Sequence, residues 1–216
     1  MATQHLDLEE QEQLDQLKAF WAKWGNAITW LLIAVLGAYA AWNGWNYWQR
    51  NQAMKAAQLY GELEVAAQAN DAPKALRIVK DMQDNAGRTA LAMHARLLAA
   101  KTLADASQFD DARAQLNAVL SDAKDQGLRA SAALRLSAIE IQAKALDKAL
   151  AVLQETWPES YAGLVADRRG DVLQAQGKRD EAIAAYQDAY RHIETGNAYR
   201  QMVAVKLNAL GVDAKE

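Results

Sequence analysis

The chain has 216 residues, with 24 lysines and arginines against 27 aspartates and glutamates, no cysteine and only two prolines. The lack of cysteine excludes disulfide frameworks, thiol chemistry and cysteine zinc sites. Residues 51–216 hold 21 basic and 22 acidic side chains, so they offer no basic surface of the kind that binds nucleic acid. Abundant alanine, leucine, glutamine and arginine favour helix, so the sequence predicts an all-α protein.

Residues 1–23 form an acidic tail, in which five acidic side chains stand against two lysines. We expect residues 1–9 to be disordered. Further on, Leu14, Leu17 and Trp21 recur at helical spacing. The second half of the tail is therefore expected to be an amphipathic helix that approaches a membrane surface obliquely.

Residues 24–49 contain no Asp, Glu, Lys, Arg or His. A helix rises ~1.5 Å per residue, so roughly 20 residues cross the ~30 Å hydrocarbon layer of a bilayer. Aromatic rings prefer the headgroup level at both ends of such a helix. The alternative, a buried helix of a soluble domain, rarely concentrates its aromatic residues at its two ends. We therefore predict a single transmembrane helix whose membrane-interface residues are Phe20, Trp21, Trp24, Trp42, Trp45, Tyr47 and Trp48.

Two further properties of this helix concern processing and orientation. Ala38-Tyr39-Ala40 matches the motif that signal peptidase cleaves, but a signal peptide begins with a short basic region and this chain begins with a longer acidic one. We expect an uncleaved signal-anchor. Two basic residues flank each end of the helix, so the positive-inside rule leaves its orientation open.

Small residues recur along one side of the predicted span. Gly37 and Ala41, and likewise Ala40 and Gly44, stand four residues apart. This spacing allows close approach of another transmembrane helix. An alanine-rich span also produces it by chance, so a lipid-facing role stays open beside the helix-packing one.

Four segments of residues 50–211 share a central alanine followed by apolar residues at helical spacing. The alanines are Ala75, Ala112, Ala149 and Ala182, which lie 37, 37 and 33 residues apart. Three of the segments carry an aspartate, at 110, 147 and 180, that we expect to cap or start the helix. An apolar helical segment precedes each alanine, at residues 53–68, 90–104, 129–143 and 163–176. The predicted unit is thus a helical hairpin, repeated about four times and stacked into one core.

The fourth hairpin, "GLVADRRGDVLQAQGKRDEAIAAYQDAY", resembles a tetratricopeptide repeat. Its small or aromatic packing residues are Gly170, Gly177, Ala182, Tyr186 and Ala189. The other three hairpins keep mainly the alanine and the apolar pattern. The last helix, "AYRQMVAVKLNALG", has no partner helix and is expected to cap the solenoid, with Gly211 in a left-handed stop conformation.

The span and the hairpins together are similar to the YfgM-like family, the ancillary subunits of the bacterial Sec translocon. The resemblance rests on "QLKAFWAKWG" before the span, "WNYW" at its end, and then "LRLSAIEIQ", "VADRRGD" and "VAVKLNAL" in this order. It implies a cytoplasmic tail at residues 1–23, an inner-membrane signal-anchor at 24–49, a periplasmic tetratricopeptide-like domain at 50–211 and a C-terminal tail at 212–216. It also implies two partners, SecYEG and a membrane-anchored periplasmic chaperone of the prolyl-isomerase type.

Motifs of catalysis or cofactor binding do not appear in the sequence. His5, His94 and His192 are far apart and give no metal-ligand spacing. No phosphate-binding glycine motif and no nucleophile elbow occurs. A Ser-His-Asp arrangement stays open, because only the fold would bring such residues together. We expect no catalytic, metal or cofactor site and no small-molecule substrate.

The first helix of each hairpin lines the concave face of a tetratricopeptide array. The groove-facing positions implied by the family fall on Ser131, Leu134, Ala138, Ile141, Gln142, Leu164, Asp167, Asp171 and Gln174. An equally simple interpretation is that these are solvated or core-edge residues. As a groove, their mixed apolar and acidic character suits a loop or an unfolded segment of a protein partner. We expect Arg168 and Arg169 to pair with acidic neighbours such as Asp171 or Glu181.

The function that follows is a non-catalytic, membrane-anchored adaptor that holds a periplasmic chaperone beside the translocon. Such co-tethering acts by raising the local concentration of the chaperone near emerging chains. Two other classes stay open. One is an envelope-stress regulator that acts through its acidic cytoplasmic tail, and the other is an enzyme with an unrecognised carboxylate pair.

Overall fold

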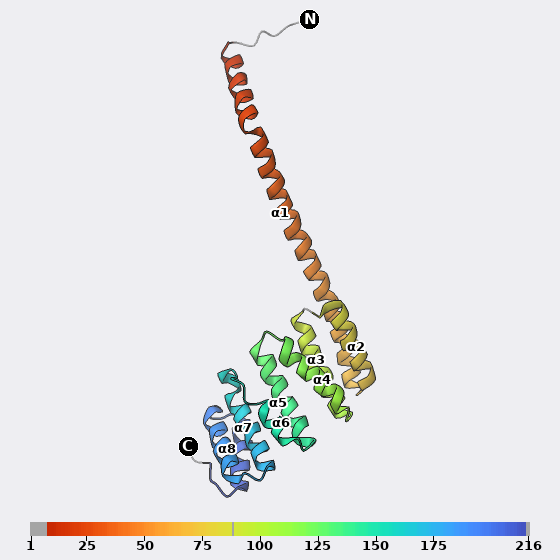
Figure 1. Cartoon of the computed structure of the whole chain (residues 1–216), viewed down its shortest axis with the longest axis vertical. Helices are drawn as coiled ribbons and strands as arrows, with labels where there is room; N and C mark the ends of the chain where they lie inside the picture. Colours follow the sequence, from red (N-terminus) through yellow and green to blue (C-terminus); the bar gives the residue numbers. More distant parts are fainter. Residues whose placement is uncertain (1–7, 88, 215–216) are drawn as a thin grey trace. The chain divides into compact units, whose positions relative to one another are not determined.

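The computed structural model describes residues 8–87 and 89–214, and these residues form nine helices and no strand (Figure 1). The all-α class that the sequence predicts is confirmed. The helices are α1 (Leu8–Gln68), α2 (Ala72–Ala86), α3 (Ala90–Asp105), α4 (Phe109–Asp122), α5 (Gln126–Gln142), α6 (Leu146–Ala151), α7 (Glu159–Ala175), α8 (Arg179–His192) and α9 (Ala198–Ala209). Of the residues expected to be disordered, 1–7 lie outside the described ones, whereas residues 8 and 9 begin α1.

The chain divides between residues 51 and 52 into two compact units. In the first unit, the described part of α1 exposes nearly every side chain from residue 12 onward. Large apolar side chains are included, for example Leu36, which is 64% exposed. Among the described residues, α1 is the one helix long and apolar enough to cross a membrane.

The second unit consists of four helical hairpins followed by α9 (Figure 1). The end of α1 pairs with α2, α3 with α4, α5 with α6, and α7 with α8. Each hairpin turns through one residue with positive φ, namely Asn70, Ser107, Lys144 and Gly177. These four turn residues repeat at 37, 37 and 33 residues, as the four alanines do. The fold is therefore the tetratricopeptide-like solenoid that the sequence predicts, with four hairpins and a final helix.

Alanine at the start of each second helix lets the paired helices approach closely. Ala75, Ala112, Ala149 and Ala182 are completely buried. Gly170 makes the closest approach, because a Cβ atom there would lie 2.5 Å from the ring of Tyr186. Both Tyr186 and Ala189 are completely buried as well. Buried residues connect the hairpins in three overlapping clusters, from the end of α1 to α9.

Two details of the hairpins differ from what the sequence suggests. The repeat pattern predicts a packing role for Gly177, but this residue is exposed with φ +77°, and a Cβ atom there would meet nothing within 4 Å. It is a turn residue. The aspartates at 110, 147 and 180 do not cap their helices, because α4, α6 and α8 each begin one residue earlier and have no side-chain cap. They lie instead in the first turn, where the helix dipole favours a negative charge.

The third hairpin departs most from the repeat. Its second helix, α6, has only six residues, whereas α2, α4 and α8 have 14 or 15. The chain continues without helix from Val152 to Pro158, with Leu153 completely buried and Trp157 half-buried. Leu153 and the Trp157 ring pack into the same cluster as Ala149 of α6 and Val165 and Val172 of α7.

Candidate interaction surfaces

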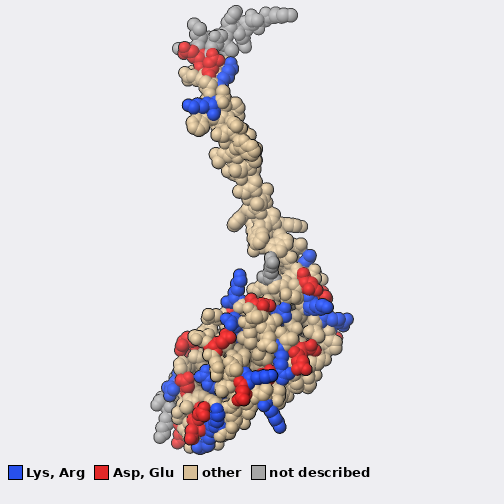
Figure 2. All heavy atoms as spheres, in the orientation of Figure 1, with Lys and Arg blue, Asp and Glu red and all other residues tan. Residues whose placement is uncertain are grey.

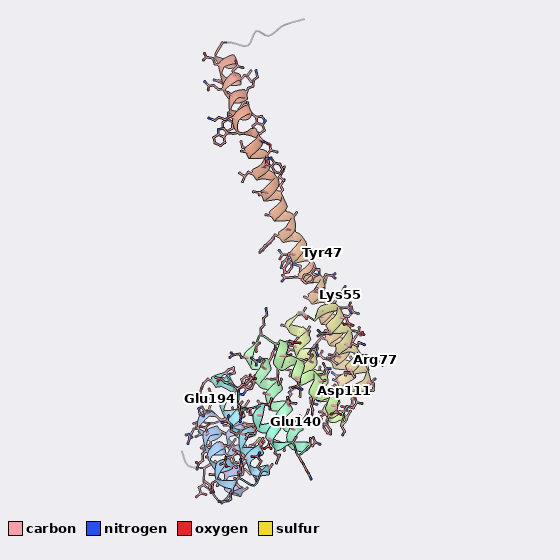
Figure 3. The ribbon with its side chains drawn as sticks, in the orientation of Figure 1. Tyr47, Lys55, Arg77, Asp111, Glu140 and Glu194 are labelled. Atoms are coloured by element: carbon pink, nitrogen blue, oxygen red, sulfur yellow. The ribbon has the colours of Figure 1, made fainter. Side chains whose placement is uncertain are left out.

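The aromatic residues at both ends of the apolar stretch of α1 are exposed. Exposure ranges from 41% at Trp48 to 74% at Tyr47, which lies near the C-terminal end of the stretch (Figure 3). Charged side chains flank this stretch and are absent from it (Figure 2). The full predicted set, Phe20, Trp21, Trp24, Trp42, Trp45, Tyr47 and Trp48, is exposed. Exposed rings at two levels of one helix are compatible with two membrane–water interfaces. That these rings lie at the interfaces stays a prediction.

The small-residue face of α1 is also open. Gly37, Ala40, Ala41 and Gly44 are exposed, and a Cβ atom at either glycine would meet nothing within 4 Å. Within the described residues no side chain therefore approaches either glycine. A helix–helix contact at this face stays a prediction.

The predicted groove residues of α5 lie mainly toward the next hairpin. Leu134 and Ile141 are half-buried and pack on the cluster of Ala149, Leu153, Val165 and Val172. The hydroxyls of Ser131 and Tyr161 share a hydrogen bond of 3.1 Å. The remaining two residues of the set, Ala138 and Gln142, are half-buried and exposed, respectively.

The predicted groove residues of α7 meet α8 and α9. Asp167 is 1% exposed, and its two carboxylate oxygens accept hydrogen bonds from the Lys206 ammonium at 2.8 Å each. The hydroxyl of Tyr199 donates to the same carboxylate at 2.7 Å. Asp171 accepts from Lys206 at 2.6 Å and from the Tyr186 hydroxyl at 2.9 Å. We call Asp167, Asp171, Gln174, Tyr186, Tyr199 and Lys206 the α7–α9 polar cluster.

Charge and burial explain why the α7–α9 polar cluster is so fully connected. A carboxylate taken out of water is costly unless it is paired and hydrogen-bonded. Burial raises the pKa of the Tyr186 phenol, and the neighbouring charge of Asp171 raises it further. Burial also raises the pKa of Tyr199, and its hydrogen bond to Asp167 adds to this effect. Both phenols therefore stay protonated and act as donors.

This geometry corrects the sequence prediction at Asp167. Its side chain is enclosed by α9, so it cannot line an open groove for a partner. Asp171 is one-quarter exposed and also bonded within the cluster. Gln174 is exposed although its amide oxygen accepts from Tyr186 at 2.8 Å, and Leu164 is half-buried. Any groove at this level thus involves Leu164, Gln174 and part of Asp171.

Comparison with known proteins extends over both units. The family of tetratricopeptide repeat-like domains matches residues 18–212. The ancillary SecYEG translocon subunit of Neisseria gonorrhoeae is 33% identical over 205 residues, which is 94% of this chain and 98% of the relative. This chain belongs to the family of ancillary SecYEG translocon subunits. Relatives of the same name from Haemophilus influenzae and Escherichia coli are 32% and 30% identical over 94% of this chain, and over 98% and 97% of their own lengths.

In this ancillary SecYEG translocon subunit homologue, the two arginines of "VADRRGD" have different partners. Arg168 lies 3.7 Å from the carboxylate of Asp171, as expected. Arg169 instead donates to the main-chain carbonyl of Leu153 at 3.3 Å, which ties α7 to the preceding hairpin. The expectation of an acidic partner is therefore wrong for Arg169.

Sequence reasoning missed the residues that complete these contacts. Lys206 is the one charged side chain between Val203 and Leu210, in an otherwise uncharged stretch, and this isolation was the available signal. A second buried ion pair joins α4 to α5, where Arg113 donates to Glu140 at 2.8 Å. Glu140 is 7% exposed. Internal ion pairs thus account for charges that sequence alone would assign to a surface.

The remaining candidates for a metal site are the histidines and acidic residues of 8–87 and 89–214. Within the described residues, no group of three or more His, Cys, Asp or Glu side chains could hold a metal ion. His94 and His192 are exposed on α3 and α8, and His5 lies outside the described residues. A pocket of about 570 Å³ opens between α8, α9 and the tail, with Gln187, Tyr190 and Arg191 in its wall.

Proposed function

We propose that this protein is a non-catalytic adaptor, anchored in the bacterial inner membrane, that associates with SecYEG and tethers a periplasmic chaperone near emerging proteins. One observation carries the proposal. The similarity to ancillary SecYEG translocon subunits covers 94% of the chain, so it includes the apolar helix as well as the hairpins. A shared anchor and a shared binding domain support a shared association with the translocon.

The proposed topology places residues 1–23 in the cytoplasm, 24–49 across the membrane, 50–211 in the periplasm as the tetratricopeptide-like domain, and 212–216 as its tail. It is supported by the uncharged, exposed stretch of α1 and by the name of the relatives. Ser160 offers a test, because it is exposed on α7 and the chain has no cysteine. Ser160→Cys should react with an impermeant maleimide added to spheroplasts. Reaction only after lysis would contradict this topology.

The mechanism is co-tethering without turnover. A chaperone of the prolyl-isomerase type, held by the hairpins, meets an emerging chain at a raised local concentration. Among the half-buried or exposed residues of the predicted groove, Ala138, Gln142, Leu164 and Gln174 are the positions at which we expect it to bind. They lie on the first helices of two successive hairpins, α5 and α7, which suits an extended segment of the chaperone.

The decisive experiment is purification of the tagged full chain from its own membranes in mild detergent, with partners identified by mass spectrometry. A matched variant carries an unrelated span in place of residues 27–48. Recovery of SecYEG and of an isomerase-type chaperone supports the proposal, and loss of SecYEG with the exchanged span assigns that contact to the membrane. Recovery of a cytoplasmic signalling protein through residues 1–23, without SecYEG, would instead favour the stress-regulator interpretation.

A further inference from the structure

The last helix, α9, exposes an apolar face that nothing in the functions above uses. Met202 and Val205 are 58% and 66% exposed. Among the described residues from 52 onward, only Met54 and Val65 of α1 are other exposed large hydrophobic side chains. The exposed face of α9 consists of Ala198, Gln201, Met202, Val205, Asn208 and Ala209, and we call it the α9 end face. It carries no charged side chain, whereas a terminal repeat normally needs a polar outer face for solubility.

The register of the repeat indicates what kind of group fits this face. At the 34-residue spacing of a tetratricopeptide repeat, Gln201, Val205 and Asn208 of α9 correspond to Asp167, Asp171 and Gln174 of α7. On α7 the two aspartates hold the next helix through Lys206. The equivalent positions of α9 are therefore suited to hold another helix. Gln201 and Val205 of α9 are neutral where α7 has the charged Asp167 and Asp171. A helix that covers these positions of α9 should therefore present a neutral face.

A second copy of α9 meets this requirement. Ala198, Met202, Val205 and Ala209 are spaced by four, three and four residues, so the pattern reads the same in both directions. An antiparallel copy would place its Val205 opposite Met202 and its Ala209 opposite Ala198. We propose that the α9 end face joins two copies of this chain as an antiparallel helix pair about a two-fold axis.

The residues at the borders of the α9 end face are compatible with self-association. On one side, Gln201 and Asn208 carry amides that both donate and accept hydrogen bonds, so the same groups can pair across a two-fold axis. On the other side lies Lys206, whose ammonium group is bonded to Asp167 and Asp171. Its charge is thus neutralised within its own chain, and two copies can meet without like-charge repulsion.

The expected strength of this contact follows from its size. One pair of 12-residue helices buries less than the roughly 1,200–2,000 Å² of a standard stable interface. The pair should therefore be weak in dilute solution and form when both copies share one membrane, which raises their effective concentration. In this respect the inference rests on the proposed membrane anchor.

The test uses the absence of cysteine from the chain. Met202→Cys is introduced into the full-length protein, its native membranes are oxidised, and the size of the product is read on a non-reducing gel. The control is Ala184→Cys, at an exposed position of α8 away from the α9 end face. We expect a disulfide-linked dimer of this chain with Met202→Cys and several-fold less with Ala184→Cys. Adding Val205→Glu to Met202→Cys should abolish the dimer, because it places like charges near the axis.

Three results would overturn the inference. They are equal yields for the two cysteine variants, a dimer that Val205→Glu does not reduce, and a Met202→Cys adduct with a different protein. Circular dichroism checks that each variant stays folded, which is expected because all three positions are exposed. Recovery of SecYEG from the same membranes is scored separately. Loss of the dimer with SecYEG retained contradicts this inference alone, and loss of SecYEG with the dimer retained contradicts the proposed function alone.

Discussion

The α5 and α7 helices both use predicted groove residues to hold the following hairpin or helix, but they use different chemistry. On α5, Leu134 and Ile141 pack on an apolar cluster. On α7, Asp167 and Asp171 hold Lys206 through charge-assisted hydrogen bonds. An apolar contact tolerates small shifts, whereas a paired buried charge requires its partner at one position. The comparison indicates that α9 is fixed in register by Lys206.

The largest expected effect comes from removing that lysine. Lys206→Met leaves the buried charge of Asp167 with Tyr199 as its remaining donor. Breaking a buried ion pair from one side costs about 3–5 kcal/mol. We expect α9 to lose amide protection in hydrogen-exchange mass spectrometry of the full chain, while α3 and α4 keep theirs. The control is Lys80→Met on α2, whose side chain is exposed. Unchanged protection of α9 would contradict a register set by Lys206.

A smaller effect is expected on the apolar side of the comparison. Leu134→Ala removes a half-buried side chain from the cluster that joins α5 to α7. Leu→Ala at a fully buried position lowers the free energy of unfolding by about 2–5 kcal/mol. At the half-buried Leu134 we expect a loss of about 1–2 kcal/mol. The expected result is a lower urea midpoint, without selective loss of protection in α9. Selective opening of α9 by Leu134→Ala would show that the two faces are not independent.

The sequence predicts the repeat far better than the contacts between repeats. Ala112 and Ala149 mark the second helices because a small residue at each hairpin crossing is a local requirement, and local requirements repeat along the chain. Lys206 meets Asp167 across 39 residues, and only the packing angle between α7 and α9 brings them together. A groove prediction that treats Asp167 as open therefore failed, although its position in the repeat was assigned from the family.

Turn chemistry shows the same limit on a smaller scale. The sequence pattern places Gly177 among the packing residues and indicates no turn residue at Asn70, Ser107 or Lys144, yet all four adopt positive φ at equivalent turns. The six-residue α6 was also not foreseen, because "LDKALAVL" has the same apolar spacing as the other second helices. Beyond α6, Leu153 and Trp157 pack into the cluster that joins α5 to α7 without being helical, and local spacing does not encode such a contact between segments.

The smallest expected effect tests whether the α7–α9 polar cluster acts as a unit. Tyr186→Phe keeps the ring against Gly170 and removes the hydroxyl, whose single proton is shared between the acceptor oxygens of Asp171 and Gln174. Loss of one such hydrogen bond costs about 1 kcal/mol. If Lys206 and Tyr186 both act through Asp171, the urea-unfolding costs of Lys206→Met and Tyr186→Phe should not add, because neighbours in one network couple by about 0.5–3 kcal/mol. Strict additivity of the two unfolding costs in the double variant would mean that Lys206 and Tyr186 stabilise α9 independently. The contacts of α7 would then differ from those of α5 only in being polar.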